Sequence, residues 1–303
     1  MSVIPTTAPT AQTAPPGLPA GLPSVVPSIV PATATPAFRG RIGRDVGSGH
    51  YAAPHRYRLH LAPADPSCLG IAVTHSLLGL DETLPLTVLP ATPDTPDGGY
   101  AVLRPLYEAS AHQYAGPATA PVLSDGWTGR IVSTHVPDIL RDLALRFRGD
   151  GPELLPEARQ DEIRAVADLC ARSVHAAAQR AGELGLDDQA AHRDPLTVLF
   201  AALGSLERRL ARHPYVLGDA PTVADVTVWV TLVQLDTVHR WHLDAAAMDR
   251  VAGHPALWAY AQRLAALPAF GRHLDIDAVL AHHRAHCRGR EAAGAAMRIV
   301  DWG

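Results

Sequence analysis

The sequence predicts a chain of two folded parts, an α/β domain followed by an all-helical domain. Between about residues 50 and 147, short stretches of strand-like alternation take turns with helical patterns. From about 155 to 285, apolar residues recur at helical spacing throughout. A run of strands and helices followed by a run of helices alone is typical of two domains that follow each other along the chain.

The first part contains signals for four strands and two helices. The expected strands cover 56–62, 84–90, 119–125 and 129–134, and the expected helices cover 66–78 and 136–147. Asp65 and Pro66 form a favoured helix start, with Asp65 as N-cap, and Gly79 supplies the stop. The order βαβ, then ββα, is that of a thioredoxin-like domain.

The second part has one strong helix-start signal. Thr222 is placed as an N-cap, and Asp225, three residues later, completes a variant of the capping box before a long apolar helix.

We expect a Pro/Ala-rich disordered tail over 1–36, a thioredoxin-like domain over 37–150, a helical domain over 151–288 and an irregular tail over 289–303.

The bulk composition restricts the possible partners. The chain has 303 residues, a net charge of −4 and no lysine, so it gives no electrostatic reason to expect nucleic acid or an anionic membrane. No apolar run reaches the roughly 18 residues that a membrane helix needs. The three cysteines are an odd number without the spacing of a disulfide framework. We therefore expect a cytoplasmic protein without membrane or nucleic-acid partners.

Several stretches together resemble one known family. The segments "YVLGDAPTVADVTVW" (215–229), "YAVLRPLYEASAHQYAGPATAPVLSDGWTGRIVSTHVPDILRDL" (100–143), "RYRLHL" and "LFAALGSLERRL" are similar to the glutathionyl-hydroquinone reductases, the xi class of glutathione transferases. The resemblance covers about 38–288. It implies a glutathione-transferase fold, a homodimer, glutathione or another low-molecular-weight thiol as cosubstrate, and a small aromatic or quinone-like substrate.

The chain departs from this family at the site. The family has C-P-W-A-H-R where this chain has "DPSCLG" (65–70), so Asp65 occupies the place of the nucleophilic cysteine. The family segment N-N-E-S, which binds the γ-glutamyl end of glutathione, is replaced by "STHV" (133–136). The resemblance implies a cis bond before Pro121. It also implies a thiol-binding surface made by Ala120, Pro121, Ser133 and Thr134.

Four residues are candidates for catalysis. Asp65 is either a helix cap alone or a general acid or base, and Cys68 is either a reactive thiol in the first helical turn or a buried apolar residue. His135 from the first part and His239 from the second, with one of His282 and His283, would face the same cleft if the family pocket is kept.

The spacing D-x-x-H-x-x-H from Asp236 to His242 matches no standard zinc motif. We therefore assign no metal from the sequence. We assign no role to Cys170 or Cys287 either.

Three functions remain open at this stage. The first is a divergent transferase or reductase that acts on a quinone or aromatic with a thiol cosubstrate. The second is a thiol-independent acid–base enzyme, such as a cyclase, lyase or isomerase of secondary metabolism. The third is a non-catalytic ligand-binding or dimerisation protein.

Overall fold

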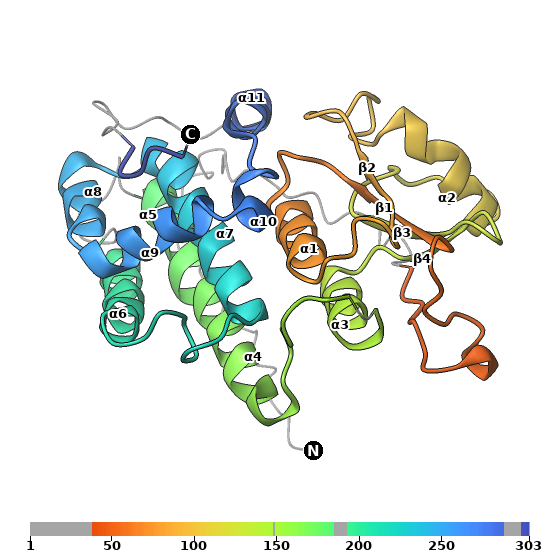
Figure 1. Ribbon diagram of the computed structural model, residues 1–303. Coiled ribbons are helices and arrows are strands. Elements are labelled where there is room, and N and C mark those ends of the chain that lie inside the picture. The colour runs from red at the N-terminus through yellow and green to blue at the C-terminus, as the bar shows by residue number, and fades with distance from the viewer. Residues whose placement is uncertain (1–37, 148, 185–192, 288–297, 303) are drawn as a thin grey trace, which may run out of the picture. The chain divides into compact units, whose positions relative to one another are not determined.

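The computed structural model describes residues 38–147, 149–184, 193–287 and 298–302, all of which belong to one compact unit of the chain, 35–303 (Figure 1). The tail expected over 1–36 and most of the one expected after 288 lie outside the described residues. Among the described helices, none combines the length and the apolar character needed to cross a bilayer.

The first part contains a mixed four-stranded sheet with the order β2-β1-β3-β4. The strands are β1 (Tyr57–Leu61), β2 (Leu86–Val88), β3 (Val122–Asp125) and β4 (Arg130–Ser133). Strand β1 is parallel to β2 and antiparallel to β3, with Leu59 opposite both Leu86 and Leu123. This arrangement confirms the thioredoxin-like order predicted from the sequence.

Helices cover both faces of this sheet. Helices α1 (Pro66–Leu77) and α3 (Val136–Arg146) pack on one face, and α2 (Arg104–Ser110) lies on the other (Figure 1). Two short 3-10 helices, η1 (Val46–Ser48) and η2 (Ala101–Leu103), complete this part.

The second part is entirely helical. In chain order its elements are η3 (Glu157–Arg159), α4 (Gln160–Asp168), the π-helix η4 (Leu169–His175), α5 (Ala176–Leu184), α6 (Arg193–Leu210), α7 (Val223–Thr237), η5 (His239–Trp241), α8 (Ala245–Ala252), α9 (Pro255–Ala265), α10 (Pro268–Gly271) and α11 (Ile276–His286). Helix α7 is the most buried of these, because 12 of its 15 residues are buried, including Trp229.

Helix α1 joins the two parts because its residues belong to both hydrophobic cores. Leu69 and Val73 pack in the core of the helical part, whereas Cys68 and Ile71 pack in the core around the sheet. Gly70 lies against Val226 and Val230 of α7, near enough that a methyl group would make ordinary van der Waals contact. The start of α1 is therefore fixed from both sides.

Asp225 forms the predicted capping box with Thr222, and it also accepts hydrogen bonds from the loop before α7 and from α9. Its Oδ2 accepts hydrogen bonds from the Thr222 N–H at 2.8 Å and from the Thr222 hydroxyl at 3.1 Å. Its Oδ1 accepts from the Val216 N–H and from the Tyr260 hydroxyl, each at 2.8 Å. This fully buried carboxylate thus connects the loop before α7, the start of α7 and helix α9.

A second buried carboxylate, Asp236, binds the C-terminal segment. It accepts hydrogen bonds from the backbone of Ile299 and Val300 at 2.8 and 3.0 Å and from the indole N–H of Trp302 at 3.0 Å. The described residues after 297 are irregular in backbone, yet Val300 and Trp302 are buried. Asp236 is therefore a structural residue.

The segment from Phe38 to Ile42 packs along β4 and α3. The Gly40 N–H donates to the Val132 carbonyl at 2.8 Å, so this segment extends the sheet beyond β4. Arg39 pairs with Asp138 at 2.8 Å and Arg41 pairs with Asp142 at 2.6 Å, which fastens the segment to α3.

Removing the carboxylate of Asp225 is expected to destabilise the protein strongly. Asp225→Ala leaves several buried donors without an acceptor, so the free energy of unfolding should fall by about 3 kcal/mol or more. Urea denaturation measures this change. The matched control is Asp275→Ala, which removes the exposed N-cap of α11 and should cost about 1 kcal/mol. Equal losses in the two variants would contradict the central role of Asp225.

Candidate functional site

The turn between β1 and α1 places a carboxylate at the start of a buried helix. Asp65 is the N-cap of α1, as predicted, and its Oδ1 accepts a hydrogen bond from the Cys68 N–H at 2.8 Å. Pro66 occupies the first helical position, where its missing N–H costs nothing. Asp65 is half-buried, so its carboxylate remains accessible from one side.

Cys68 lies in the apolar interior, where burial disfavours the thiolate form of its side chain. The side chain is 1% exposed and belongs to the core around the sheet. Burial, and then the charge of Asp65, raises the pKa of the Cys68 thiol well above its usual range. Since the thiolate is the nucleophile, the structure favours the apolar interpretation of Cys68.

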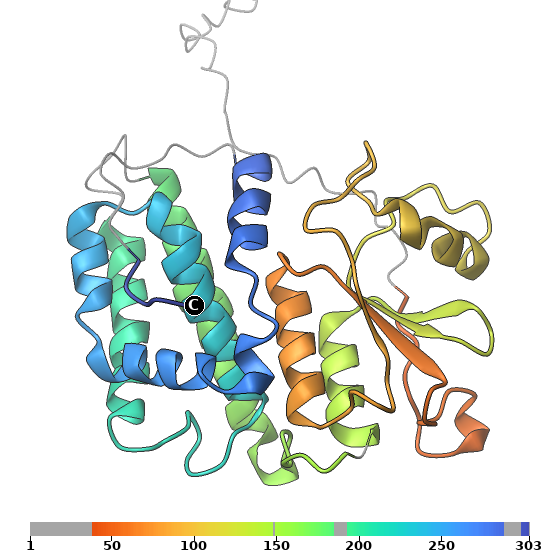
Figure 2. The same ribbon diagram turned by 45° about the horizontal axis from the view of Figure 1, so that its top comes forward.

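Two further side chains lie within reach of the charge of Asp65. Burial raises the pKa of Tyr100 to about 12, and the charges of Cys68 and Asp65 act in the same direction. Burial also lowers the pKa of His282, on α11, while the carboxylate of Asp65 opposes that shift. Helix α11 stands at the junction of the two parts in both views (Figures 1 and 2). The charge of Asp65 therefore acts on a phenol and on an imidazole.

The environment of His282 suits proton transfer. Its Nδ1 is buried and forms no hydrogen bond within the described part of the chain. Its ring stacks on His286, with the centroids 4.2 Å apart. A lowered pKa keeps this imidazole neutral at neutral pH, so it can accept a proton.

His135 contacts residues of β4 and α3 and does not contact Asp65 in the described part of the structure. It is the N-cap residue of α3, and its Nδ1 lies 2.9 Å from the Asp138 carboxylate, which also binds Arg39. Its backbone N–H donates to the Ser133 hydroxyl at 3.1 Å. Among the described contacts, none connects His135 with Asp65.

His239 is buried in the helical part. Its Nε2 lies 2.9 Å from Nδ1 of His175, and burial lowers the pKa of His239 to about 3. The four catalytic candidates are therefore not assembled into one cluster: Asp65 and Cys68 are adjacent, while His135 and His239 each bind other residues. The sequence analysis proposed no site role for Tyr100. It named His282 only as one of two alternatives, the other being His283.

The surface expected to bind a thiol is partly available. The Ala120–Pro121 bond is cis, as the resemblance implies. Within the described residues no hydrogen bond to the Ala120 backbone is found. The Thr134 N–H, in contrast, donates to the Phe38 carbonyl at 2.9 Å, and Ser133 is buried.

A cavity of about 180 Å³ lies next to this turn, between the two parts. Its wall is formed by residues 61–63, one face of α1 including Cys68, two residues of β2, and the segment 272–275. Arg272 binds Asp81 at 2.7 Å, and His273 lies 2.6 Å from the Ser76 hydroxyl. The volume of the cavity is close to that of a cavity of about 150 Å³ that holds benzene, but its wall also contains Arg272, His273 and Asp275 and includes neither Asp65 nor His282.

Comparison with known proteins places the chain in a family. Residues 189–263 match the family model described as glutathione S-transferase, C-terminal domain. The crystal structure of a glutathione transferase from Gordonia bronchialis is 30% identical in sequence, with a TM-score of 0.69 and 81% of each chain covered. The chain belongs to the glutathione transferase superfamily.

Its relatives include glutathionyl-hydroquinone reductases. A protein of that name from Sphingobium chlorophenolicum is 25% identical over 253 residues, which cover 78% of this chain and 80% of the relative. The glutathione-bound structure of an Escherichia coli transferase homologue shares the fold, with a TM-score of 0.71, 23% identity and coverage of 86% and 95%. The predicted glutathione-transferase fold is confirmed.

The capping and chemical roles of Asp65 can be separated by two substitutions. Asparagine caps helices as well as aspartate does, so Asp65→Asn should leave the free energy of unfolding nearly unchanged. Asp65→Ala should lower it by about 1 kcal/mol, because the Cys68 N–H loses its acceptor. Thermal or urea denaturation measures both values. A large loss in Asp65→Asn would show that the charge itself stabilises the fold.

The Asp138 cluster should make stability depend on pH. Burial acts against ionisation, but the hydrogen bond from Arg39 and the nearby charges of His135 and Arg41 outweigh it and lower the pKa of Asp138. A lowered folded-state pKa gives stability that is present above the unfolded pKa of about 3.9 and is lost as the pH falls through the folded value.

Asp138→Asn should therefore cost about 1 kcal/mol at neutral pH, and its difference from the wild type should close below pH about 4. Urea denaturation across this range tests the expectation. The exposed Asp161→Asn is the control and should show no difference at any pH.

Proposed function

We propose that this protein adds a small thiol to a single-ring quinone or a related aromatic acceptor at the start of α1, with Asp65 and His282 as the proton-transfer pair. The observation on which this depends is the carboxylate of Asp65 at the α1 N-cap, whose charge acts on the half-buried imidazole of His282. The cavity beside the turn is of the right size for one ring.

The available groups favour addition over thiol exchange. A carboxylate cannot form the mixed disulfide that thiol exchange requires, and Cys68 is a buried thiol with a raised pKa. Addition needs only proton movement. The sulfur of the cosubstrate bonds to a ring carbon, and the thiol proton passes through His282 to one quinone oxygen. The hydrogen on the attacked carbon then leaves as a proton, the ring becomes aromatic, and the second quinone oxygen gains a proton. The product is a thioether of the hydroquinone, and no external reductant is consumed.

Asp65 orients and supports the imidazole in this scheme. Its negative charge stabilises the protonated form of His282 as that form develops, which offsets the cost of burial. A positioned acid–base group contributes about 100- to 10,000-fold to a rate.

The thiol is expected to lie along the Ala120 backbone, to which no hydrogen bond is found within the described residues. Glutathione is bound in the structure of the Escherichia coli homologue, which supports a thiol here. The Thr134 N–H is already used by Phe38, and Ser133 and His135 replace other groups in the family segment. A thiol other than glutathione, such as mycothiol, is therefore a real candidate.

A thiol-independent acid–base reaction is the second candidate. The same pair, Asp65 and His282, favours it, because proton transfer to and from a substrate carbon or oxygen needs no sulfur. The engaged Thr134 N–H also favours it, since part of the thiol surface is occupied by the protein itself.

The test combines binding and turnover on the full-length protein. Calorimetric titration with glutathione and with mycothiol measures binding. Consumption of 2,6-dimethyl-1,4-benzoquinone, corrected for the uncatalysed reaction, measures thiol addition. Asp65→Asn and His282→Gln should each lower kcat/KM by about 100-fold or more. The exposed helix cap Asp244→Asn is the matched control and should retain full activity.

Each outcome selects one function. Thiol binding with Asp65-dependent addition supports the transferase, and no thiol binding excludes it in favour of the second candidate. Saturable quinone binding without turnover in any assay would support a binding protein. Asp65→Cys adds a further check: a thiol at this helix start should introduce reduction of a glutathionyl-hydroquinone, provided that glutathione binds.

A further inference from the structure

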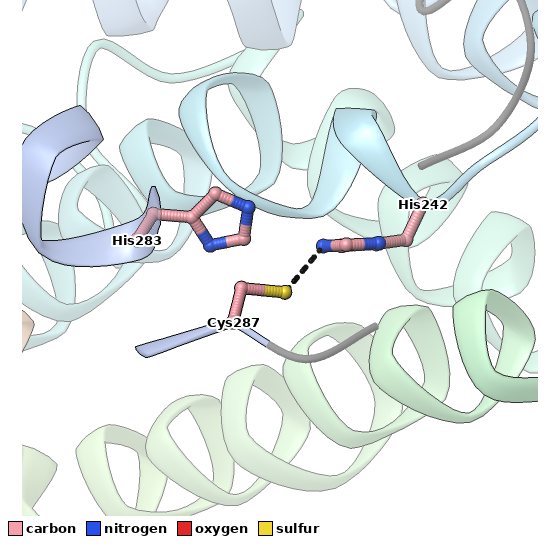
Figure 3. Close-up of side chains that lie close together, drawn as sticks. All are labelled: His242, His283 and Cys287. Carbon is pink, nitrogen blue, oxygen red and sulfur yellow. Dashed lines mark hydrogen bonds between the residues drawn. The ribbon is translucent and has the colours of Figure 1, made fainter. Parts of the chain in front are cut away.

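Three side chains with metal-binding atoms meet at the end of α11, outside the cluster around Asp65. They are His242, which follows η5, and His283 and Cys287, at the C-terminal end of α11 (Figure 3). One ligand atom from each lies within 4.8 Å of the others. All three side chains are half-buried, so solvent and ions can reach them.

Two of these donors are brought together by the helical spacing of α11. His283 and Cys287 are four residues apart, which places them on one face at the end of the helix, and the Cys287 N–H donates to the His283 carbonyl at 2.7 Å. His242 comes from the segment that ends the central α7–η5 region. Two donors from one helix and a third from a distant segment form a frequent arrangement in metal sites.

The distances are close to those of a tetrahedral ion. Bond lengths of 2.3 Å to sulfur and 2.0–2.1 Å to nitrogen place neighbouring ligand atoms about 3.3–3.6 Å apart. The Cys287 sulfur already lies 3.3 Å from Nε2 of His242. The rings of His242 and His283 have centroids 5.2 Å apart, so only a small turn of these side chains is required.

The donor set selects the type of ion. One thiolate and two imidazoles are borderline-soft ligands that suit zinc, whereas calcium and magnesium prefer oxygen. We propose that His242, His283 and Cys287 bind a zinc ion, with the fourth coordination position left to water. This proposal is independent of the function proposed for Asp65.

A zinc ion at this position would hold α11 against the rest of the helical part. Helix α11 buries only Ala278 and Val279 along its length, so apolar packing contributes little to its attachment. A zinc ion would join the end of α11 to the segment after α7. Because the ion binds the folded arrangement, it should order this helix.

The test uses the untagged full-length protein after removal of metal by a chelator. Zinc is titrated against a competing chromophoric chelator, and cobalt is added separately as a spectroscopic probe. We expect one tight site per chain and a thiolate-to-cobalt charge-transfer band. Hydrogen exchange of the α11 backbone should slow when zinc is added.

Variants identify the ligands. Cys287→Ser should abolish the charge-transfer band, and His242→Gln and His283→Gln should each weaken zinc binding by more than the about 10- to 100-fold that loss of an outer-shell partner costs. His286→Gln, an exposed histidine in the last turn of the same helix, is the matched control and should bind zinc as the wild type does.

Two results would overturn the proposal. One is the lack of a stoichiometric site in the wild-type protein. The other is unchanged zinc affinity in Cys287→Ser and His242→Gln, which would assign any binding to other histidines. Circular dichroism of each variant shows whether it is folded.

Discussion

The position of the candidate site depends on the burial of helix α1 between two hydrophobic cores. Leu69 and Val73 face the helical part, and Cys68 and Ile71 face the sheet, so the helix cannot shift toward either side without opening a cavity. Its first residues, and with them the carboxylate of Asp65, are therefore held at the boundary of the two parts. The cavity beside the turn lies at the same boundary, as ligand sites between domains often do.

A helix start can serve more than one chemistry. Backbone N–H groups at the beginning of α1 stabilise any anion placed there, whether a thiolate or a carboxylate. Replacing sulfur by carboxylate keeps this electrostatic match and keeps the helix cap, but a carboxylate cannot form the mixed disulfide of thiol exchange. The fold of the family can thus be retained while its cysteine chemistry is lost.

Local features could be predicted from the sequence, and long-range ones could not. The Asp65 cap and the Thr222–Asp225 capping box follow from side chains three residues apart, so the sequence contains all the relevant information. The electrostatic effect of Asp65 on His282, more than two hundred residues later, depends on how α11 packs.

The histidines show the same limit. Asp236, His239 and His242 are each three residues apart and would share one face of a continuous helix, yet they lie in three different environments. Asp236 binds the C-terminal segment, His239 lies against His175, and His242 lies against Cys287. No regular helix runs from 236 to 242, because α7 ends at Thr237 and a 3-10 turn follows, so helical spacing gives the wrong geometry there.

The segment before the first strand has a consequence for association between chains. Because Gly40 pairs with Val132, Arg39 with Ser133 and Phe38 with Thr134, the described residues 38–40 cover the outer side of β4 at its C-terminal end. The opposite margin of the sheet is β2, which is only three residues long. Exposed edge strands can pair with strands of another molecule. Here the edge strand β4 is partly covered, and the edge strand β2 is short. Two copies of this chain would therefore have to recognise each other through side chains, with little opportunity to merge their sheets.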